Sequence, residues 1–261
     1  MILTKCFVFI SNPKTGSTSA EDIIFQAAHL KSLNTPNAIV LVRRIAVKLG
    51  LTKPVIRRFL VRGTKGARHK HANCAQIPDS HKALPYIATF REPVQWILSH
   101  IRYENANHIA INVLNHRNAP NTIEEKIEIY LKYGEKLRKK HNITNSKVGY
   151  FSVHFIIQLH PEPNKIFQDL NDGQRVKFEL FSRVHFLNFE RQSQDLLFAM
   201  NAYGFCQPYL SSLQTNKHLN RSANKSNSDD SKAVINYVSN YEPNLLNWYR
   251  EFLESTNPRP K

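Results

Sequence analysis

A short segment near the amino terminus combines a cation, a glycine and several hydroxyls in an order that suits anion binding. Residues 13–19 read PKTGSTS and follow the apolar run Cys6–Ile10, which is typical of a strand buried in a parallel sheet. The hydroxyl residues open a helix with an apolar stripe, and N–H groups at a helix N-terminus attract anions. Gly16 permits a positive φ, and Lys14 can direct its ammonium at the same anion. The segment predicts phosphate binding, with an ordinary capped turn as the alternative.

A second candidate segment follows the apolar run Leu84–Phe90, which predicts another buried strand. The strand ends in Arg91-Glu92-Pro93, and an Arg at a strand's carboxyl end can hold a phosphate through two hydrogen bonds. Pro93 favours the first turn of a helix. Ser99 lies six residues beyond Pro93, about 9 Å along such a helix, on a different face from its apolar stripe.

Together the two segments resemble the cofactor-binding motifs of the sulfotransferases that use 3′-phosphoadenosine-5′-phosphosulfate (PAPS). The first family motif is approximately Pro-Lys-x-Gly-(Ser/Thr)-(Ser/Thr), and the second is Arg-(Asp/Asn)-Pro with a Ser eight positions after the Arg. Arg91 and Ser99 keep that spacing, and Glu92 replaces the usual Asp or Asn. The likeness is nearer to carbohydrate-type and bacterial members than to the phenol type.

The resemblance implies a transfer of the sulfuryl group from PAPS to an acceptor hydroxyl or amine, with a carbohydrate among the candidate acceptors. Residues 184–190 resemble the family's later strand, which ends in an acidic residue, and residues 219–222 resemble its late Asn-x-Ser segment. The 5′-phosphosulfate would be held by the first motif and the 3′-phosphate by the second. The implied cofactor contacts are Lys14, Thr15, Gly16, Ser17, Thr18, Ser19, Arg91, Ser99, Asn220 and Ser222.

Two residues are the candidates for catalysis. We expect Lys14 to neutralise the charge that builds on the leaving 5′-phosphate, because such transfers depend on positioning and charge stabilisation. His71 lies where several glycan-modifying members carry a His, and it is the candidate general base. The alternatives are Glu104 as the base, or a basic loop in which His69 and His71 are solvated. The spacing His69-x-His71-x-x-Cys74 matches no standard zinc pattern, and we expect no metal.

The elements that must position these groups follow from hydrophobic patterning. Strand–loop–helix, strand–helix and strand–helix in sequence predict an α/β fold: a three-layer sandwich with a mainly parallel central sheet, flanking helices and a P-loop-like phosphate-binding loop after the first strand. Helices are expected over 38–62 (broken near Pro54), 122–140, 192–202 and 245–253, the last belonging to a helix capped by Asp229 or Asp230 and interrupted at Pro243. Residues 62–71 and 207–230 are expected as loops, and 146–170 stay unassigned. Residues 1–261 are expected to form one domain.

Composition limits the classes of partner. The chain has 261 residues and a formal net charge of +16, which favours anionic partners such as a phosphorylated cofactor or an acidic acceptor. Three scattered cysteines, no signal-like segment and no apolar run of transmembrane length predict a cytoplasmic protein with no membrane span. The basic residues between the two motifs either line a cleft for an anionic acceptor or lie on solvated faces. They include Arg43, Arg44, Arg57, Arg58, Arg62, Lys65, Arg68 and Lys70.

Two other functions stay open. An ATP-dependent phosphotransferase or kinase of the P-loop type would use the same kind of sheet, but the chain contains no Gly-Lys dipeptide and hence no Walker A motif. It also lacks the G-x-G-x-x-G pattern of dinucleotide folds. A basic nucleic-acid-binding protein would explain the charge, yet no helix-turn-helix, zinc-finger or RNP-type signature is present, so no specific nucleic acid is expected.

Overall fold

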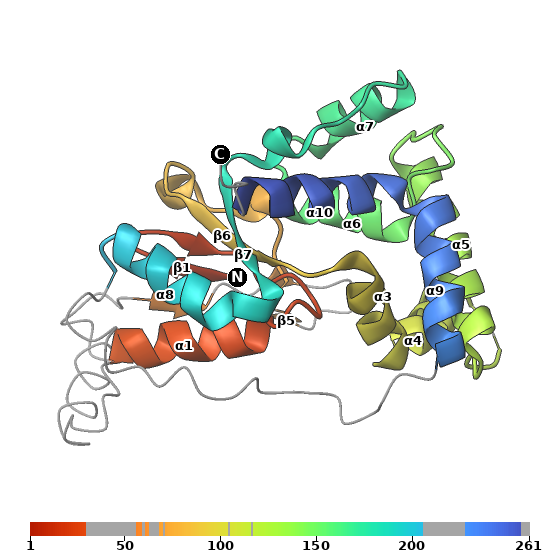
Figure 1. Ribbon diagram of the computed structural model, residues 1–261, viewed down its shortest axis with the longest axis horizontal. Coiled ribbons are helices and arrows are strands. Elements are labelled where there is room, and N and C mark those ends of the chain that lie inside the picture. Colours follow the sequence, from red (N-terminus) through yellow and green to blue (C-terminus); the bar gives the residue numbers. More distant parts are fainter. Residues whose placement is uncertain are drawn as a thin grey trace. The chain divides into compact units, whose positions relative to one another are not determined.

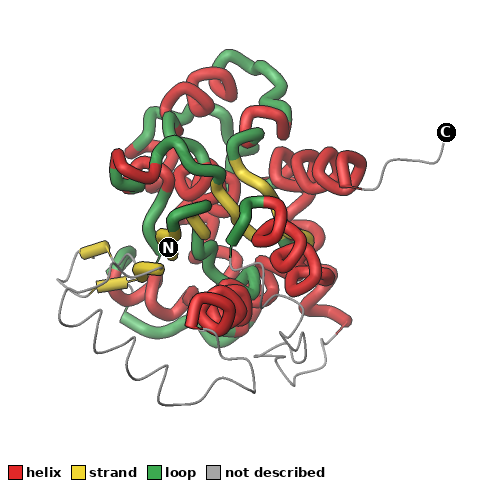
Figure 2. Tube along the Cα trace, turned by 90° about the vertical axis from the view of Figure 1, so that its left-hand side faces the viewer, coloured by secondary structure: helices red, strands yellow, loops and turns green. Residues whose placement is uncertain are grey.

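The computed structural model describes residues 1–29, 56–58, 61–62, 68–69, 71–103, 105–115, 117–205 and 228–256. The chain divides into two compact units, which are Met1–Phe90 with Arg183–Arg221, and Arg91–Ser182 with Ser222–Lys261. Figure 1 labels the elements of both units, and Figure 2 separates helices, strands and loops by colour. The expectation of a single domain concerns how the two units assemble, and it stays a prediction.

A mixed sheet of five strands forms the centre of the first unit, in the order β3-β1-β2-β6-β7. Parallel ladders join β2 to β6 and β6 to β7, whereas β1 pairs antiparallel with both β2 and β3. Within this sheet β1 alone therefore runs against the other strands, and the predicted α/β class with a mainly parallel sheet is confirmed. The strands are β1 Ile2–Thr4, β2 Val8–Phe9, β3 Ile56–Arg58, β6 Tyr86–Phe90 and β7 Val184–Asn188.

Two helices of the first unit pack beside each other against this sheet, α1 (Ser17–His29) and α8 (Gln192–Ala202). Both are labelled in Figure 1. Phe9 pairs in register with Ile87, and both side chains join one buried cluster with apolar residues of the two helices. Burying a large apolar side chain contributes about 1.5–3 kcal/mol, so this face fixes the strands to the helices. The cluster holds Ile2, Phe7, Phe9, Ala20, Ile24, Ala27, Ile87, Leu187, Leu196, Ala199, Met200 and Phe205.

Several predicted elements of this unit are confirmed. Strands β6 and β7 occupy the two later apolar runs, and α8 has the predicted bounds. Helix α1 begins at Ser17, as the hydroxyl residues indicated. A short 3-10 helix, Phe189–Arg191, connects β7 to α8. The loops that follow β2, β6 and β7 all leave the carboxyl ends of parallel strands, where ligands of such folds bind.

Other predictions for this unit were wrong. Ile56–Arg58 and Val61–Arg62 are strands, although the region 38–62 was expected to be helical. Ile56–Arg58 pairs with β1, and this pairing outweighs the local pattern because strand formation depends on neighbours. The expected loop 62–71 contains a strand, β5 (Arg68–His69), which pairs antiparallel with β4 (Val61–Arg62). The sequence pattern also missed β1, so the strand before the phosphate loop is the second of the chain.

The second unit is helical within its described residues. Its helices are α3 Pro93–Arg102, α4 Asn105–Asn112, α5 Ile123–Lys140, α6 Tyr150–Leu159, α7 Pro163–Asn171, α9 Ser228–Tyr241 and α10 Pro243–Thr256. Helix α5 confirms the expected helix, with Thr122 and Glu125 forming a reciprocal capping box. The unassigned region 146–170 contains α6 and α7. None of the described helices is long and apolar enough to cross a membrane.

The end of the chain differs in detail from its prediction. Asp229 and Asp230 do not cap the final helix, because they lie inside α9, which begins at Ser228. Residues 228–230 therefore belong to a helix and not to the expected loop. Pro243 does separate two helices, as predicted, and α10 starts at this residue. Aromatic pairs fill the core of the second unit. The ring centroids of Phe155 and Trp248, which are stacked, lie 5.6 Å apart, and those of Trp96 and Phe151, which meet edge-on, lie 5.4 Å apart.

Candidate active site

The loop of residues 13–19 is named the phosphate loop after its predicted ligand. The sign of φ alternates along its backbone. The φ angle is 60° at Lys14 and 74° at Gly16, and it is not positive at Thr15 between them. A positive φ is uncommon outside glycine, so Lys14 is held in a conformation that most side chains avoid. Alternation of this kind turns successive N–H groups toward one side, and such concavities bind anions. The loop runs directly into α1, whose first N–H groups have no partner within the helix.

Asn12, immediately before this loop, is a buried polar residue that sequence reasoning overlooked. Only 1% of its surface is exposed, and neither atom of its side-chain amide has a hydrogen-bond partner within the described part of the chain. Its backbone oxygen accepts a hydrogen bond of 2.9 Å from the Thr15 hydroxyl. A buried amide without partners costs free energy, and a polar ligand would offset that cost.

The hydroxyl side chains of the loop differ in their roles. Thr15 is buried and donates its hydroxyl hydrogen to Asn12, so its backbone N–H is the donor that it can offer an anion. Ser17 and Ser19 are also buried in the first turn of α1, and Thr18 is exposed there. Lys14 is half-buried. The expectation that these residues contact a phosphosulfate stays a prediction.

Gln192, the first residue of α8, fixes the loop from outside and was also missed. Its Nε2 donates to the Thr15 carbonyl oxygen at 3.0 Å and to the Thr89 hydroxyl at 2.6 Å. Gly16 lies so close to it that a Cβ atom there would be 2.7 Å from Gln192 Oε1. The glycine is therefore required both by its positive φ and by this approach. Nothing in the sequence indicated this contact, because Gln192 and Thr15 are 177 positions apart.

His71 lies against the strand end that leads into the loop. Its Nδ1 is 2.6 Å from the carbonyl oxygen of Ser11. A carbonyl oxygen only accepts, so Nδ1 carries the hydrogen and the neutral ring has its lone pair on Nε2. Ser11 is buried and donates its hydroxyl to Glu21 of α1 at 2.7 Å, which fixes the strand end to the helix. The structure thus places His71 beside Ser11, two residues before the loop, and its role as a general base stays a prediction.

The second motif belongs to the second unit and has a well-defined local structure. Arg91 is half-buried and follows β6 directly, and Ser99 is half-buried in α3. Glu92 caps α3, because its carboxylate accepts hydrogen bonds from Val94 N–H at 3.1 Å and from Gln95 N–H at 2.7 Å. Glu92, which replaces the usual Asp or Asn of the family motif, therefore caps the helix as an Asp or Asn would. That Arg91 and Ser99 share a ligand with the loop stays a prediction.

Several predicted residues lie outside the described part of the chain. Among them are the implied cofactor contacts Asn220 and Ser222 and the alternative base Glu104. The same holds for Arg43, Arg44, Lys65 and Lys70. The structure tests none of these predictions.

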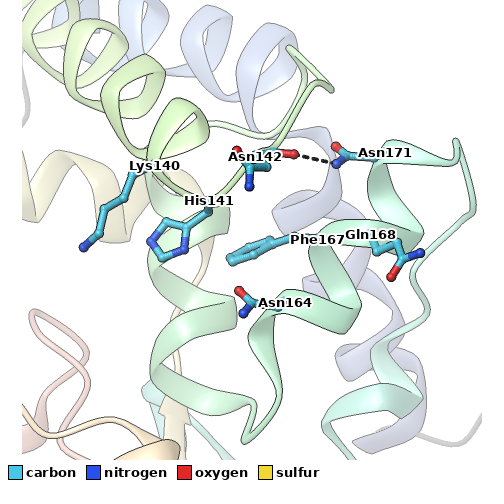
Figure 3. Close-up of a pocket in the computed structure, with 7 residues that line it drawn as sticks. All are labelled: Lys140, His141, Asn142, Asn164, Phe167, Gln168 and Asn171. Carbon is cyan, nitrogen blue, oxygen red and sulfur yellow. Dashed lines mark hydrogen bonds between the residues drawn. The ribbon is translucent and has the colours of Figure 1, made fainter.

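A separate pocket of about 440 Å³ lies in the second unit, between the end of α5 and α7 (Figure 3). Asn171 closes one side by donating to the Asn142 carbonyl oxygen at 2.7 Å, and its Oδ1 accepts from Thr144 N–H at 2.8 Å. Burial and the neighbouring Lys140 lower the pKa of His141 below its usual range. The lining contains no carboxylate, thiol or hydroxyl side chain, so it lacks an acid–base pair for group transfer. The full lining is Lys140, His141, Asn142, Asn164, Phe167, Gln168 and Asn171.

Within the described ranges, no group of three or more His, Cys, Asp or Glu side chains is placed to hold a metal ion. The expectation of a metal-free site stays a prediction. Cys74, in the segment with His71, is buried, and this burial raises the pKa of its thiol to about 12. No protein-family model matches the chain, and neither a curated protein nor a solved structure matches it.

Proposed function

We propose that the chain is a sulfotransferase that moves the sulfuryl group of PAPS to an acceptor hydroxyl or amine. The observation that carries the proposal is the alternation of φ at Lys14, Thr15 and Gly16, directly after a parallel strand and before a helix. This is the backbone that an anion-binding loop needs, at the position where the first motif stands. The buried amide of Asn12 beside the loop supports a polar ligand there.

Two side chains would do the chemistry in this proposal. The PAPS molecule supplies an activated sulfuryl group whose leaving partner is a phosphate. Lys14 would neutralise the charge that develops on that phosphate, which is the largest demand of such a transfer. His71 would take the proton of the acceptor hydroxyl on Nε2, while its Nδ1–H donates to Ser11 and stabilises the charged ring.

The finer architecture is part of the same proposal. We infer that the fold is the three-layer, P-loop-like sandwich expected from the sequence, with residues 1–261 as one domain. In that arrangement Arg91 and Ser99 would hold the 3′-phosphate that distinguishes PAPS from other adenylates. The acceptor would be anionic or a carbohydrate, consistent with the net charge of +16.

The deciding experiment measures thermal stabilisation by 3′-phosphoadenosine-5′-phosphate, the product of PAPS, against AMP, ADP and ATP. A ligand that binds only the folded state raises the unfolding temperature by mass action. We expect stabilisation by the 3′,5′-bisphosphate, with a large loss in Lys14→Ala and in Arg91→Ala. Matched controls are Lys5→Ala and Arg117→Ala, because both residues are exposed.

The outcomes separate the open functions. Stabilisation by ATP with none by the 3′,5′-bisphosphate would replace this proposal with a phosphotransferase. Salt-sensitive binding of nucleic acid that the bisphosphate does not displace would favour the nucleic-acid alternative. Equal stabilisation of the wild type and of Lys14→Ala would remove the phosphate loop from the site.

A further inference from the structure

Gln192 is placed to control the conformation of the phosphate loop. It is the first residue of α8, 2% exposed, and its side chain reaches across to the loop and to β6. Its single Nε2 group uses its two hydrogens on two acceptors, the Thr15 carbonyl oxygen at 3.0 Å and the Thr89 hydroxyl at 2.6 Å. Both are good hydrogen-bond distances, and both acceptors are buried.

The bond to the Thr15 carbonyl sets the direction of the next N–H group. The structure contains no cis peptide bond within its described residues, and a trans peptide places its C=O and N–H on opposite sides. Holding the Thr15 oxygen toward α8 therefore turns the Gly16 N–H away from α8. This N–H belongs to the alternating stretch that would face the anion.

The bond to Thr89 joins the loop to the strand that carries the second motif. Thr89 is one residue before the end of β6, and Arg91 follows that strand directly. One side chain thus connects the loop after β2, the end of β6 and the start of α8. Loop, strand and helix are held at one point by two buried hydrogen bonds: one restrains the loop, and the other fixes the Gln192 amide to β6.

The packing around Gly16 leaves little tolerance at this point. Added Cβ atoms at Gly16 would approach Gln192 Oε1 to 2.7 Å, Phe189 Cε2 to 2.9 Å and Gln192 Nε2 to 3.0 Å. The Gln192 amide therefore packs closely against the backbone of Gly16 and also donates to the Thr15 carbonyl oxygen. A Cβ atom at position 16 or a bulkier side chain at position 192 would have to displace the loop.

We infer that Gln192 is a positioning residue for the phosphate loop, whose amide pre-organises the Gly16 N–H for the 5′-phosphate end of the bound nucleotide. The inference rests on the proposed function, since it assumes that the loop binds this nucleotide. Gln192 donates two hydrogen bonds, one to the loop and one to β6, and neither goes to the site where the anion would bind. Its contribution is to remove the cost of ordering the loop when the ligand binds.

The test compares the affinity for 3′-phosphoadenosine-5′-phosphate, measured by titration calorimetry, in the wild type and in Gln192→Met. Methionine keeps the length and packing of glutamine and removes both donors. The loss of two hydrogen bonds predicts about tenfold weaker binding, with the far-UV circular dichroism unchanged. Gln194→Met on the same helix is the matched control, because Gln194 is exposed, and it should bind as the wild type does.

A second variant supplies a readout that packing alone would not move. Gln192→Glu has the shape of glutamine but donates only when its carboxyl group is protonated. Its affinity relative to the wild type should therefore recover as the pH falls toward about 5, near the ordinary pKa of a Glu. If Gln192→Met does not fold, this pH profile decides the question.

The two proposals fail in different ways. Wild-type binding with an unchanged affinity in Gln192→Met, or a flat relative pH profile in Gln192→Glu, would overturn the positioning role and leave the proposed function intact. No binding by the wild type would overturn both. A tenfold loss that Gln194→Met shares would also reject the specific role of Gln192.

Discussion

Replacing Glu242 with glutamine tests how the second unit holds the first turn of α6. The Glu242 carboxylate is fully buried, and each of its oxygens accepts two hydrogen bonds. Oε1 accepts from Phe151 N–H at 2.8 Å and from the Tyr237 hydroxyl at 3.1 Å. Oε2 accepts from the N–H and the hydroxyl of Ser152, at 2.8 and 2.6 Å. The carboxylate thus caps a helix whose own N-cap, Gly149, has no side chain.

The cost of the substitution follows from counting donors and acceptors. Glutamine has nearly the shape of glutamate, but it presents one oxygen and one NH₂ group. The hydroxyls of Tyr237 and Ser152 can rotate and accept from the new amide, whereas a backbone N–H cannot. In either orientation of the amide, one buried N–H of Phe151 or Ser152 loses its acceptor, which costs about 1–3 kcal/mol.

The pH dependence of stability distinguishes this carboxyl group from an ordinary one. Burial raises the pKa of Glu242 from 4.5 to about 7, although hydrogen bonds from Ser152, Phe151 and Tyr237 act in the opposite direction. Between these values the folded chain holds a proton that the unfolded chain has released. The stability contributed by this group is therefore complete below pH 4.5 and is lost as the pH rises through about 7, by roughly 3 kcal/mol in total.

The assay is urea unfolding followed by far-UV circular dichroism, at several values between about pH 5 and pH 8, a range set by the two pKa values. The difference in unfolding free energy between the wild type and Glu242→Gln should be largest at the acid end and should shrink as the pH rises. Glu254→Gln is the control, because Glu254 is exposed on α10. A difference that stays constant with pH would refute the raised pKa, and one near zero at every pH would refute the capping role.

Two further predictions concern the first unit. Gly16→Ala should lower the unfolding temperature and abolish stabilisation by 3′-phosphoadenosine-5′-phosphate, because the position combines a φ of 74° with a Cβ only 2.7 Å from Gln192 Oε1. Gly173→Ala separates the two causes, since φ is 71° there and an added Cβ would meet no atom of the described residues within 4 Å, apart from its chain neighbours. An equal loss of unfolding temperature in Gly173→Ala and Gly16→Ala would show that φ alone is responsible. Cys74 should resist iodoacetamide in the native protein and react after unfolding, because burial raises its pKa to about 12. Peptide mass mapping at about pH 8 checks this, and equal native and unfolded labelling would contradict it.

Local sequence patterns located the elements that carry strong periodicity or clear punctuation. The apolar runs that became β6 and β7, the capped helix α5 and the helix α8 were all predictable, because each is specified by neighbouring residues. The phosphate loop was found in the same way, from glycine and hydroxyl residues between a strand and a helix. Its φ angles are positive at Lys14 and Gly16, and its binding of a phosphate stays a prediction.

The short strands β1 and β3 could not be predicted, because they are specified by distant residues and not by neighbouring ones. β1 and β3 are three residues long. They pair with each other, and β1 also pairs with β2. Three residues give no measurable alternation, and the charged Arg57 and Arg58 resembled a helix surface. Pairing over more than 50 positions is a tertiary effect that a local pattern does not contain.

Gly16 and Gly149 show why the sequence predicted only part of the structure around these positions. At Gly16 the neighbour is the Gln192 amide, and at Gly149 it is the Glu242 carboxylate, each a buried polar group from a distant part of the chain. In both places a Cβ atom would overlap the polar group that satisfies nearby backbone atoms. The sequence shows the glycine and cannot show its partner, so Gly16 was predicted only as a residue that permits a positive φ and contacts the cofactor. A buried polar side chain that lies against a glycine therefore fixes the local backbone from a distant part of the sequence, and at residues 13–19 this side chain is Gln192.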